Sequence, residues 1–240
     1  MQEIVLGWEM KYVFDPVEKV TLPVIGSDTA FPVGQIYCVG RNYAEHAIEM
    51  GHDPDRKAPF FFIKPGYTIL QDGELMTYPS LSADVHHEVE LVVALAHGGE
   101  NIAVEDAMEL VFGYAVGIDM TRRDLQAQAK EKSRPWEAGK TFKHAAPCSG
   151  IVPIATSGEI NSGEISLSVN GVQRQRGDVN QMIWKIAEVI SKLSELFVLQ
   201  PGDLIYTGTP AGVGPVNTGD EIKAQIEGVG NLGIRIGEPA

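Results

Sequence analysis

Two carboxylates that could bind a metal lie close together in the segment His87-Glu88-Val89-Glu90. Residues two apart in a β-strand project from the same face, so Glu88 and Glu90 are expected to point together. Neighbouring carboxylates repel each other unless a cation lies between them or water solvates both. The apolar residues Leu91 to Ala96 follow, which favours a strand that enters the core. The pattern indicates a metal site, and an exposed acidic start of a strand is the alternative.

A third oxygen ligand is available at Asp119, which follows the apolar run Tyr114 to Ile118. An aspartate in this position is also common as a turn or capping residue. Three carboxylates would favour a hard cation, Mg²⁺ or Mn²⁺ with Ca²⁺ also compatible, over zinc. We expect no cationic side chain among the three acids. A metal ion would then be needed to balance their negative charges.

Polar side chains that could hold a substrate occur beyond Asp119. Arg123 and Gln126 are three residues apart and share a helix face, where they could bind a carboxylate or simply be solvated. Lys140 lies in an apolar, aromatic stretch, so a partly buried ammonium with an anionic partner is expected. The trio Gly139-Lys140-Thr141 ends like a phosphate loop, but Arg134 stands where that loop needs glycine, which excludes nucleotide binding.

Two further segments could contribute chemistry. His46 and Glu49 are three residues apart in an expected helical turn, so Glu49 could orient the imidazole as a base. A histidine beside a glutamate on a helix surface is the alternative. Residues 207–214 form a glycine-rich loop in which backbone amides and the Thr209 hydroxyl could bind a carboxylate. A plain structural turn would fit this loop equally well.

Several strands and few helices are expected to position these residues. Strands are predicted at residues 35–39, 59–64, 86–96 and 114–119, as a hairpin over 165–177 turning at Asn170-Gly171, and in the tail after residue 201. Helices are predicted at residues 42–51, 104–113, 121–132 and 181–197. Thr121 and Asp124 have capping-box spacing, and residues 52–59 should form an exposed, mobile loop. The absence of a βαβ rhythm favours an antiparallel or mixed β architecture.

The overall composition narrows the class of protein. The chain has 240 residues and a formal net charge of -13, which repels phosphate backbones and excludes a nucleic-acid partner. Its two cysteines, Cys38 and Cys148, lack metal-type spacing and suit a buried reduced pair. No leader pattern occurs and no apolar run reaches the ~18 residues of a membrane span, so a cytoplasmic location is expected.

Five segments together resemble the fumarylacetoacetate hydrolase superfamily, and most closely its acylpyruvase and fumarylpyruvate hydrolase branch. They are GRNYAEH at 40–46, HHEVEL at 86–91, GYAVGIDMTRRD at 113–124, GKTF at 139–142 and PGDLIYTGTPAGVG at 201–214. The resemblance runs from about residue 32 to the C-terminus. It implies an α+β, mainly β fold of the mixed β-sandwich roll type, with an N-terminal arm at 1–34 and a catalytic domain at 35–240. It also implies a homodimer with one Mg²⁺ or Mn²⁺ per subunit.

The resemblance implies a role for each candidate residue. Glu88, Glu90 and Asp119 match the metal ligands. The positions that hold the carboxylate and carbonyl end of the substrate are matched by Arg123, Gln126, Lys140 and Thr209. His46 and Glu49 match the dyad that activates water, on a segment that closes over the site, and Lys140 would offset developing negative charge. Close relatives often carry an acidic residue directly after the GKTF motif, whereas Lys143 and His144 follow it here. This difference bears on the substrate preference and leaves the core chemistry unchanged.

The implied activity is a metal-dependent hydrolase that acts on C–C bonds in ketonic substances, of the kind used in aromatic catabolism. It would split a small 2,4-dioxo acid, an acylpyruvate or fumarylpyruvate, into pyruvate and a carboxylic acid. Oxaloacetate decarboxylation and hydroxymuconate-type isomerisation or decarboxylation on the same site are the alternatives within the family. A non-catalytic metal-binding protein with this fold is the alternative outside the enzyme class.

Overall fold

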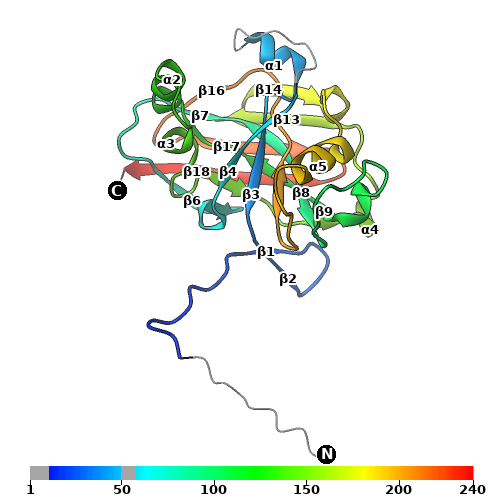
Figure 1. Cartoon of the computed structure of the whole chain (residues 1–240). Helices are drawn as coiled ribbons and strands as arrows, with labels where there is room; N and C mark the ends of the chain where they lie inside the picture. Colours follow the sequence, from blue (N-terminus) through cyan, green and yellow to red (C-terminus); the bar gives the residue numbers. More distant parts are fainter. Residues whose placement is uncertain (1–10, 50–57, 240) are drawn as a thin grey trace, which may run out of the picture.

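The computed structural model describes residues 11–49 and 58–239, and two β-sheets dominate it (Figure 1). The larger sheet follows the order β4-β3-β15-β8-β9-β11-β5, with β12 paired to β9. It mixes parallel pairs, β3 with β15 and β5 with β11, with antiparallel ones. Its strands are β3 (Ile36–Gly40), β4 (Phe60–Lys64), β5 (Ile69–Gln71), β8 (Val89–Leu95), β9 (Val111–Ile118), β11 (Ala146–Cys148), β12 (Val152–Pro153) and β15 (Leu204–Tyr206).

The smaller sheet has the order β14-β13-β17-β18-β6. Its strands are β6 (Leu75–Tyr78), β13 (Glu164–Val169), β14 (Val172–Asp178), β17 (Glu221–Ile226) and β18 (Gly230–Pro239). Buried and more exposed residues alternate along β13 and β17, as in a sheet with one face on the core. Asn170 and Gly171 join β13 to β14 with positive φ angles of 51° and 76°, which confirms the predicted hairpin turn.

The main core lies between the two sheets, and this packing positions the strands that carry the acids. Side chains from both sheets form one buried cluster, which includes Leu91, Val116, Leu167, Ile222 and Ile234. All seven residues of β8 are buried, because both faces of the larger sheet are covered. The second face packs against the hairpin of β1 (Thr21–Pro23) and β2 (Ala30–Pro32). Together these layers confirm the mainly β, α+β class.

The remaining elements are short. Strands β7 (Val85–His87), β10 (Thr121–Arg122) and β16 (Gly214–Val216) form a small third sheet. The α-helices are α1 (Ala44–Glu49), α2 (Arg123–Glu131), α3 (Glu137–Lys140), α4 (Ile154–Ser157) and α5 (Ile186–Ser194). None of the helices in the described residues combines the length and the apolar composition that a membrane crossing needs. Both cysteines are buried and free, as expected.

The structure corrects three of the predicted elements. The strand expected over 86–96 is broken at Glu88, so β7 and β8 belong to different sheets. The helix expected over 104–113 is only a 3₁₀ turn at Ala107–Leu110, because pairing with β8 makes the chain extended from Val111 onward. The helix expected over 181–197 begins only at Ile186. Residues 50–57 lie outside the described part, and with them most of the loop expected to be mobile.

The capping box predicted at Thr121 and Asp124 is also wrong. Helix α2 begins at Arg123, after an N-cap residue whose side chain forms no capping hydrogen bond. Thr121 is in β10, where its hydroxyl donates to the carbonyl of Asp119 at 3.3 Å. The Asp124 carboxylate accepts hydrogen bonds from the Ala83 amide and the Ser82 hydroxyl, at 3.1 and 2.7 Å. It therefore ties α2 to the turn before β7 and so fixes the end of the helix that carries Arg123.

Candidate metal centre and its pocket

The three predicted ligands meet where β8 and β9 pair. Glu88 occupies the break before β8, Glu90 lies within β8, and Asp119 directly follows β9. The antiparallel register pairs Val89 with Ile118, and the Asp119 amide donates to the Glu88 carbonyl at 2.8 Å. One carboxylate oxygen of each acid lies within 4.8 Å of the others. All three residues are at most 5% exposed, so the alternative of an exposed acidic strand is wrong.

Lys140 lies against two of these acids. Its ammonium, on α3, donates to Glu88 Oε2 at 2.7 Å and to Asp119 Oδ2 at 2.6 Å. Its third contact is the Thr121 hydroxyl at 2.6 Å. Arg123, at the start of α2, forms an ion pair with the other oxygen of Glu88. The expectation that no cationic side chain lies among the three acids is therefore wrong, because two helices distant in sequence bring their cations to the strand ends.

Lys64 is a third cation near the acids, and nothing in the sequence pattern had singled it out. It ends β4 and is completely buried. Its ammonium donates to the carbonyls of Met120, Lys140 and Ala145 at 3.0, 2.7 and 2.8 Å. These carbonyls use all three of its hydrogens, although Asp119 Oδ1 is only 2.8 Å away. The only signal for this role in the sequence is a lysine that ends an apolar strand.

This arrangement fits a divalent cation. Asp119 Oδ1 is buried and accepts no hydrogen bond from the residues that the structure describes. Glu90 accepts one hydrogen bond, from the Gly208 amide to Oε2 at 2.8 Å. Burial, with the charges of Asp119 and Glu88, raises the pKa of Glu90 well above its ordinary value. A bound cation would use Asp119 Oδ1, which pairs with Lys64 by charge without accepting a hydrogen bond from it, and would stabilise the charged form of Glu90.

The residues expected to hold the substrate lie beside the triad. Arg123 Nη1 donates to Gln126 Oε1 at 2.7 Å, and Gln126 is buried, so a fully solvated helix face is excluded. Thr209 is also buried, and its hydroxyl accepts from Gln175 Nε2 at 2.8 Å. Gln175 was not singled out from the sequence. It also contacts His87 Nδ1 at 2.9 Å, so it links the loop of Thr209 to the strand before Glu88.

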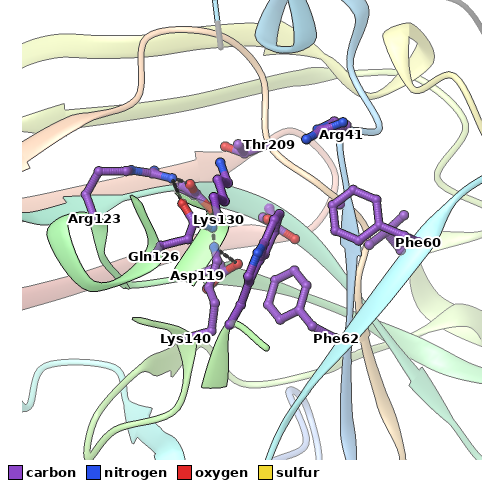
Figure 2. A pocket seen from close by; sticks show the side chains of 14 residues that line it. Arg41, Phe60, Phe62, Asp119, Arg123, Gln126, Lys130, Lys140 and Thr209 are labelled. Carbon is purple, nitrogen blue, oxygen red and sulfur yellow. Dashed lines mark hydrogen bonds and ion pairs between the residues drawn. The ribbon is translucent and has the colours of Figure 1, made fainter. Parts of the chain in front are cut away.

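The acidic triad and the expected substrate-binding residues line one cavity of about 440 Å³, a volume that includes space open to solvent (Figure 2). The candidate residues in its wall are Glu88, Glu90, Asp119, Arg123, Gln126, Lys140 and Thr209. The other lining residues are Val39, Gly40, Arg41, Phe60, Phe62, Lys130 and Trp136. No function was expected for this second group, because an isolated arginine, lysine or aromatic residue carries no spacing signal.

The expected catalytic dyad is placed only in part. His46 and Glu49 belong to α1, but the side chain of His46 lies outside the described part of the structure. Both carboxylate oxygens of Glu49 lie 3.1 Å from the Gly212 amide, which donates to them. Glu49 therefore ties α1 to the glycine-rich loop that carries Thr209. Its contact with His46 stays a prediction.

Comparison with known proteins then decides the family. Residues 35–236 match the family described as fumarylacetoacetate (FAA) hydrolase C-terminal. The chain belongs to the fumarylacetoacetate hydrolase family. A solved fumarylpyruvate hydrolase from Pseudomonas aeruginosa, in complex with Mn²⁺ and pyruvate, superposes with a TM-score of 0.93 at 48% identity. The match covers 95% of this chain and 100% of that one, which confirms the expected β-sandwich roll. The Mn²⁺ of that relative and the buried triad here support the expected divalent cation.

Other members of the family carry different activities. A fumarylpyruvate hydrolase from a Ralstonia species is 42% identical over 78% of this chain and 98% of its own length. An oxaloacetate decarboxylase from Dictyostelium discoideum is 43% identical over 81% and 89%. An oxaloacetate tautomerase from Escherichia coli is 40% identical over 82% and 90%. These relatives are enzymes that act on small oxo acids. The hydrolase, the decarboxylase and the tautomerase are about equally similar to this chain, so sequence identity does not indicate which of the three reactions it catalyses.

Proposed function

We propose that this member of the fumarylacetoacetate hydrolase family is a metal-dependent hydrolase that cleaves the C3–C4 bond of a small 2,4-dioxo acid. The products would be pyruvate and a carboxylic acid. The observation that carries the proposal is the buried triad of Glu88, Glu90 and Asp119 inside a cavity of about 440 Å³. A partly enclosed pocket lined by aromatic rings and a few convergent charged groups suits a small molecule.

We assign the metal to the triad, as Mg²⁺ or Mn²⁺. When bound, the cation polarises the substrate oxygens and stabilises negative charge on them. Charge balance supports an anionic substrate. Three carboxylates and the three cations Lys64, Lys140 and Arg123 cancel formally, so the ion adds a net positive charge to a low-dielectric site.

Arg123, Gln126 and Thr209 are proposed to hold the carboxylate and the adjacent carbonyl of the substrate. Arg123 Nη1 and Gln126 Oε1 are hydrogen-bonded, so the two side chains present one polar surface. Lys140 acts differently, because Glu88, Asp119 and Thr121 use its three hydrogens. It would keep two carboxylates together and offset, through its charge, the negative charge that develops in a water-poor pocket.

His46 is proposed as the base that takes a proton from the attacking water, with Glu49 orienting it. The water oxygen bonds to C4, the C3–C4 bond breaks, and its electron pair goes to C3, which gains a proton to give pyruvate. General-base help of this kind contributes ~10²–10⁴ in rate. The contact between Glu49 and the Gly212 amide supports the assignment, because it holds α1 next to the loop that carries Thr209.

Oxaloacetate tautomerisation or decarboxylation is the second candidate, and the relatives at 40% and 43% identity favour it. Neither reaction needs water to attack C4. The test is a panel of fumarylpyruvate, acetylpyruvate and oxaloacetate, assayed with Mg²⁺ and with Mn²⁺ for substrate loss and pyruvate release. Metal-dependent cleavage of either acylpyruvate supports the hydrolase. Turnover of oxaloacetate alone would replace it with the second candidate.

We further propose that the chain acts as a homodimer on its small-molecule substrate, as its family resemblance implies. Light scattering coupled to size-exclusion chromatography should give twice the chain mass of 26.0 kDa. A monomer at micromolar concentration would contradict this. The cytoplasmic location expected from the sequence stays a prediction.

A further inference from the structure

Two cations in the pocket wall have no part in the proposed reaction. Arg41 follows β3 and Lys130 lies in the last turn of α2. Both line the same cavity as the acidic triad. In Figure 2 they lie toward the top of the view with Thr209, whereas Asp119 and Lys140 lie below them. The two cations therefore line a part of the cavity above the triad and its paired cations.

Aromatic rings hold these two cations in place. The Arg41 guanidinium lies over the Phe60 ring, 5.4 Å from its centre, and the Lys130 ammonium lies 4.9 Å from the centre of the Trp136 ring. Phe60 and Trp136 contact each other edge to face, with ring centres 5.2 Å apart. The four side chains thus contact one another in turn: Arg41 lies over Phe60, Phe60 contacts Trp136, and Lys130 lies against Trp136. Such contacts limit side-chain freedom and lower the cost of binding an anion.

The charge of this part of the cavity is not balanced. Within residues 11–49 and 58–239, neither Arg41 nor Lys130 forms an ion pair. Burial lowers the pKa of Lys130, and repulsion by Arg123, Arg41 and Lys140 lowers it further, against an attraction from Glu88. Cations that crowd together in a chain of net charge -13 are unusual, because acids are plentiful. An anionic ligand would remove this repulsion.

We infer that Arg41 and Lys130 form a subsite for a second carboxylate, at the far end of a dicarboxylic 2,4-dioxo acid. Phe60 and Trp136, whose rings meet edge to face, line that arm with apolar surface, which suits an unsaturated chain between the two acid groups. The subsite selects dicarboxylic substrates over acylpyruvates with a neutral tail. This inference rests on the proposed function for the reaction itself, whereas the recognition of the second carboxylate can be measured without turnover.

The first experiment compares kcat/KM for fumarylpyruvate, which carries the second carboxylate, with kcat/KM for acetylpyruvate, which does not. Arg41→Met and Lys130→Met should each lower the ratio of the two values roughly 10- to 100-fold, since charge-assisted hydrogen bonds are lost. Arg41→Lys should restore part of the ratio. Lys192→Met, in α5 and away from the cavity, is the matched control for a lost positive charge. An equal loss for both substrates would mean general attraction of anions and would overturn the inference.

The second experiment measures binding by calorimetry in the presence of Mn²⁺. It compares 2-oxoglutarate with 2-oxopentanoate, which have the same chain length and differ in the terminal carboxylate. Wild-type protein should bind 2-oxoglutarate at least tenfold more tightly, and both methionine variants should lose that preference. This result would support the subsite even if no acylpyruvate were cleaved and the proposed hydrolysis failed. Equal affinity of the wild-type protein for the two acids would overturn the subsite, whatever the enzyme cleaves.

Discussion

The ammonium of Lys140 lies 2.6 Å from Asp119 Oδ2, and both residues are buried at the centre of the candidate metal site. Lys140 also holds Glu88, so it bridges two of the three proposed ligands. This contact offsets part of the repulsion among the acids when no metal is bound. It also leaves Glu90 as the ligand that forms no ion pair with any described residue, and the two glutamates should therefore respond differently to substitution.

Glu90→Gln should abolish metal binding and turnover while changing the stability of the metal-free protein little. The amide keeps the shape of the side chain and can still accept from the Gly208 amide. Glu88→Gln should also abolish activity, but it leaves Arg123 without its anion and Lys140 with Asp119 alone, and it should lower stability. Metal content by mass spectrometry and thermal unfolding without metal measure the two effects. Full activity of wild-type protein after exhaustive chelation would rule out the metal site.

Lys140→Met should destabilise the metal-free protein by ~3 kcal/mol or more, because two buried carboxylates lose their shared cation. Added Mn²⁺ should restore part of that loss, since the ion replaces the missing charge. The measurement is the free energy of unfolding in urea, with chelator and with Mn²⁺. Turnover should remain low even with the metal. A variant as stable as wild type without metal would show that Lys140 does not hold the triad.

His46→Ala should separate chemistry from metal binding. The proposed base is in α1 and not among the three acids, so the variant should retain its metal. Hydrolysis of acylpyruvates should fall by ~10²–10⁴. Decarboxylation of oxaloacetate, if the wild-type protein catalyses it, should fall less because no water is activated. Wild-type rates of hydrolysis in this variant would remove His46 from the mechanism.

Oxalate should compete with the substrate and bind only when Mg²⁺ or Mn²⁺ is present. It presents two adjacent, negatively charged oxygens, as the substrate does when negative charge develops on it during cleavage. Analogues of that state usually bind more tightly than substrates. Acetate should bind much more weakly, because it lacks the second group. Calorimetry with and without metal measures both ligands. Oxalate binding of equal affinity in chelator would place the substrate somewhere other than at the triad.

Local signals in the sequence were sufficient for the features that depend on neighbouring residues. Asn170-Gly171 predicts its hairpin turn because both residues accept positive φ. The spacing of Glu88 and Glu90, with Asp119 at the end of an apolar run, indicated the acidic triad that the structure contains. The joint occurrence of five motifs indicated the family, which the match over residues 35–236 confirms.

Tertiary structure alone decided what surrounds that triad. The contact between Lys140 and Glu88 joins residues 52 apart in the chain, and that between Gln175 and His87 joins residues 88 apart. No short-range pattern encodes such contacts, since they depend on how α3 and β14 pack against the end of β7 and the break that follows it. Pairing between β8 and β9 likewise made residues 111–113 extended where the sequence suggested a helix. The sequence by itself determined which acids could bind a metal, and packing determined which cations balance them, because charge pairing in a buried site depends on distance in space.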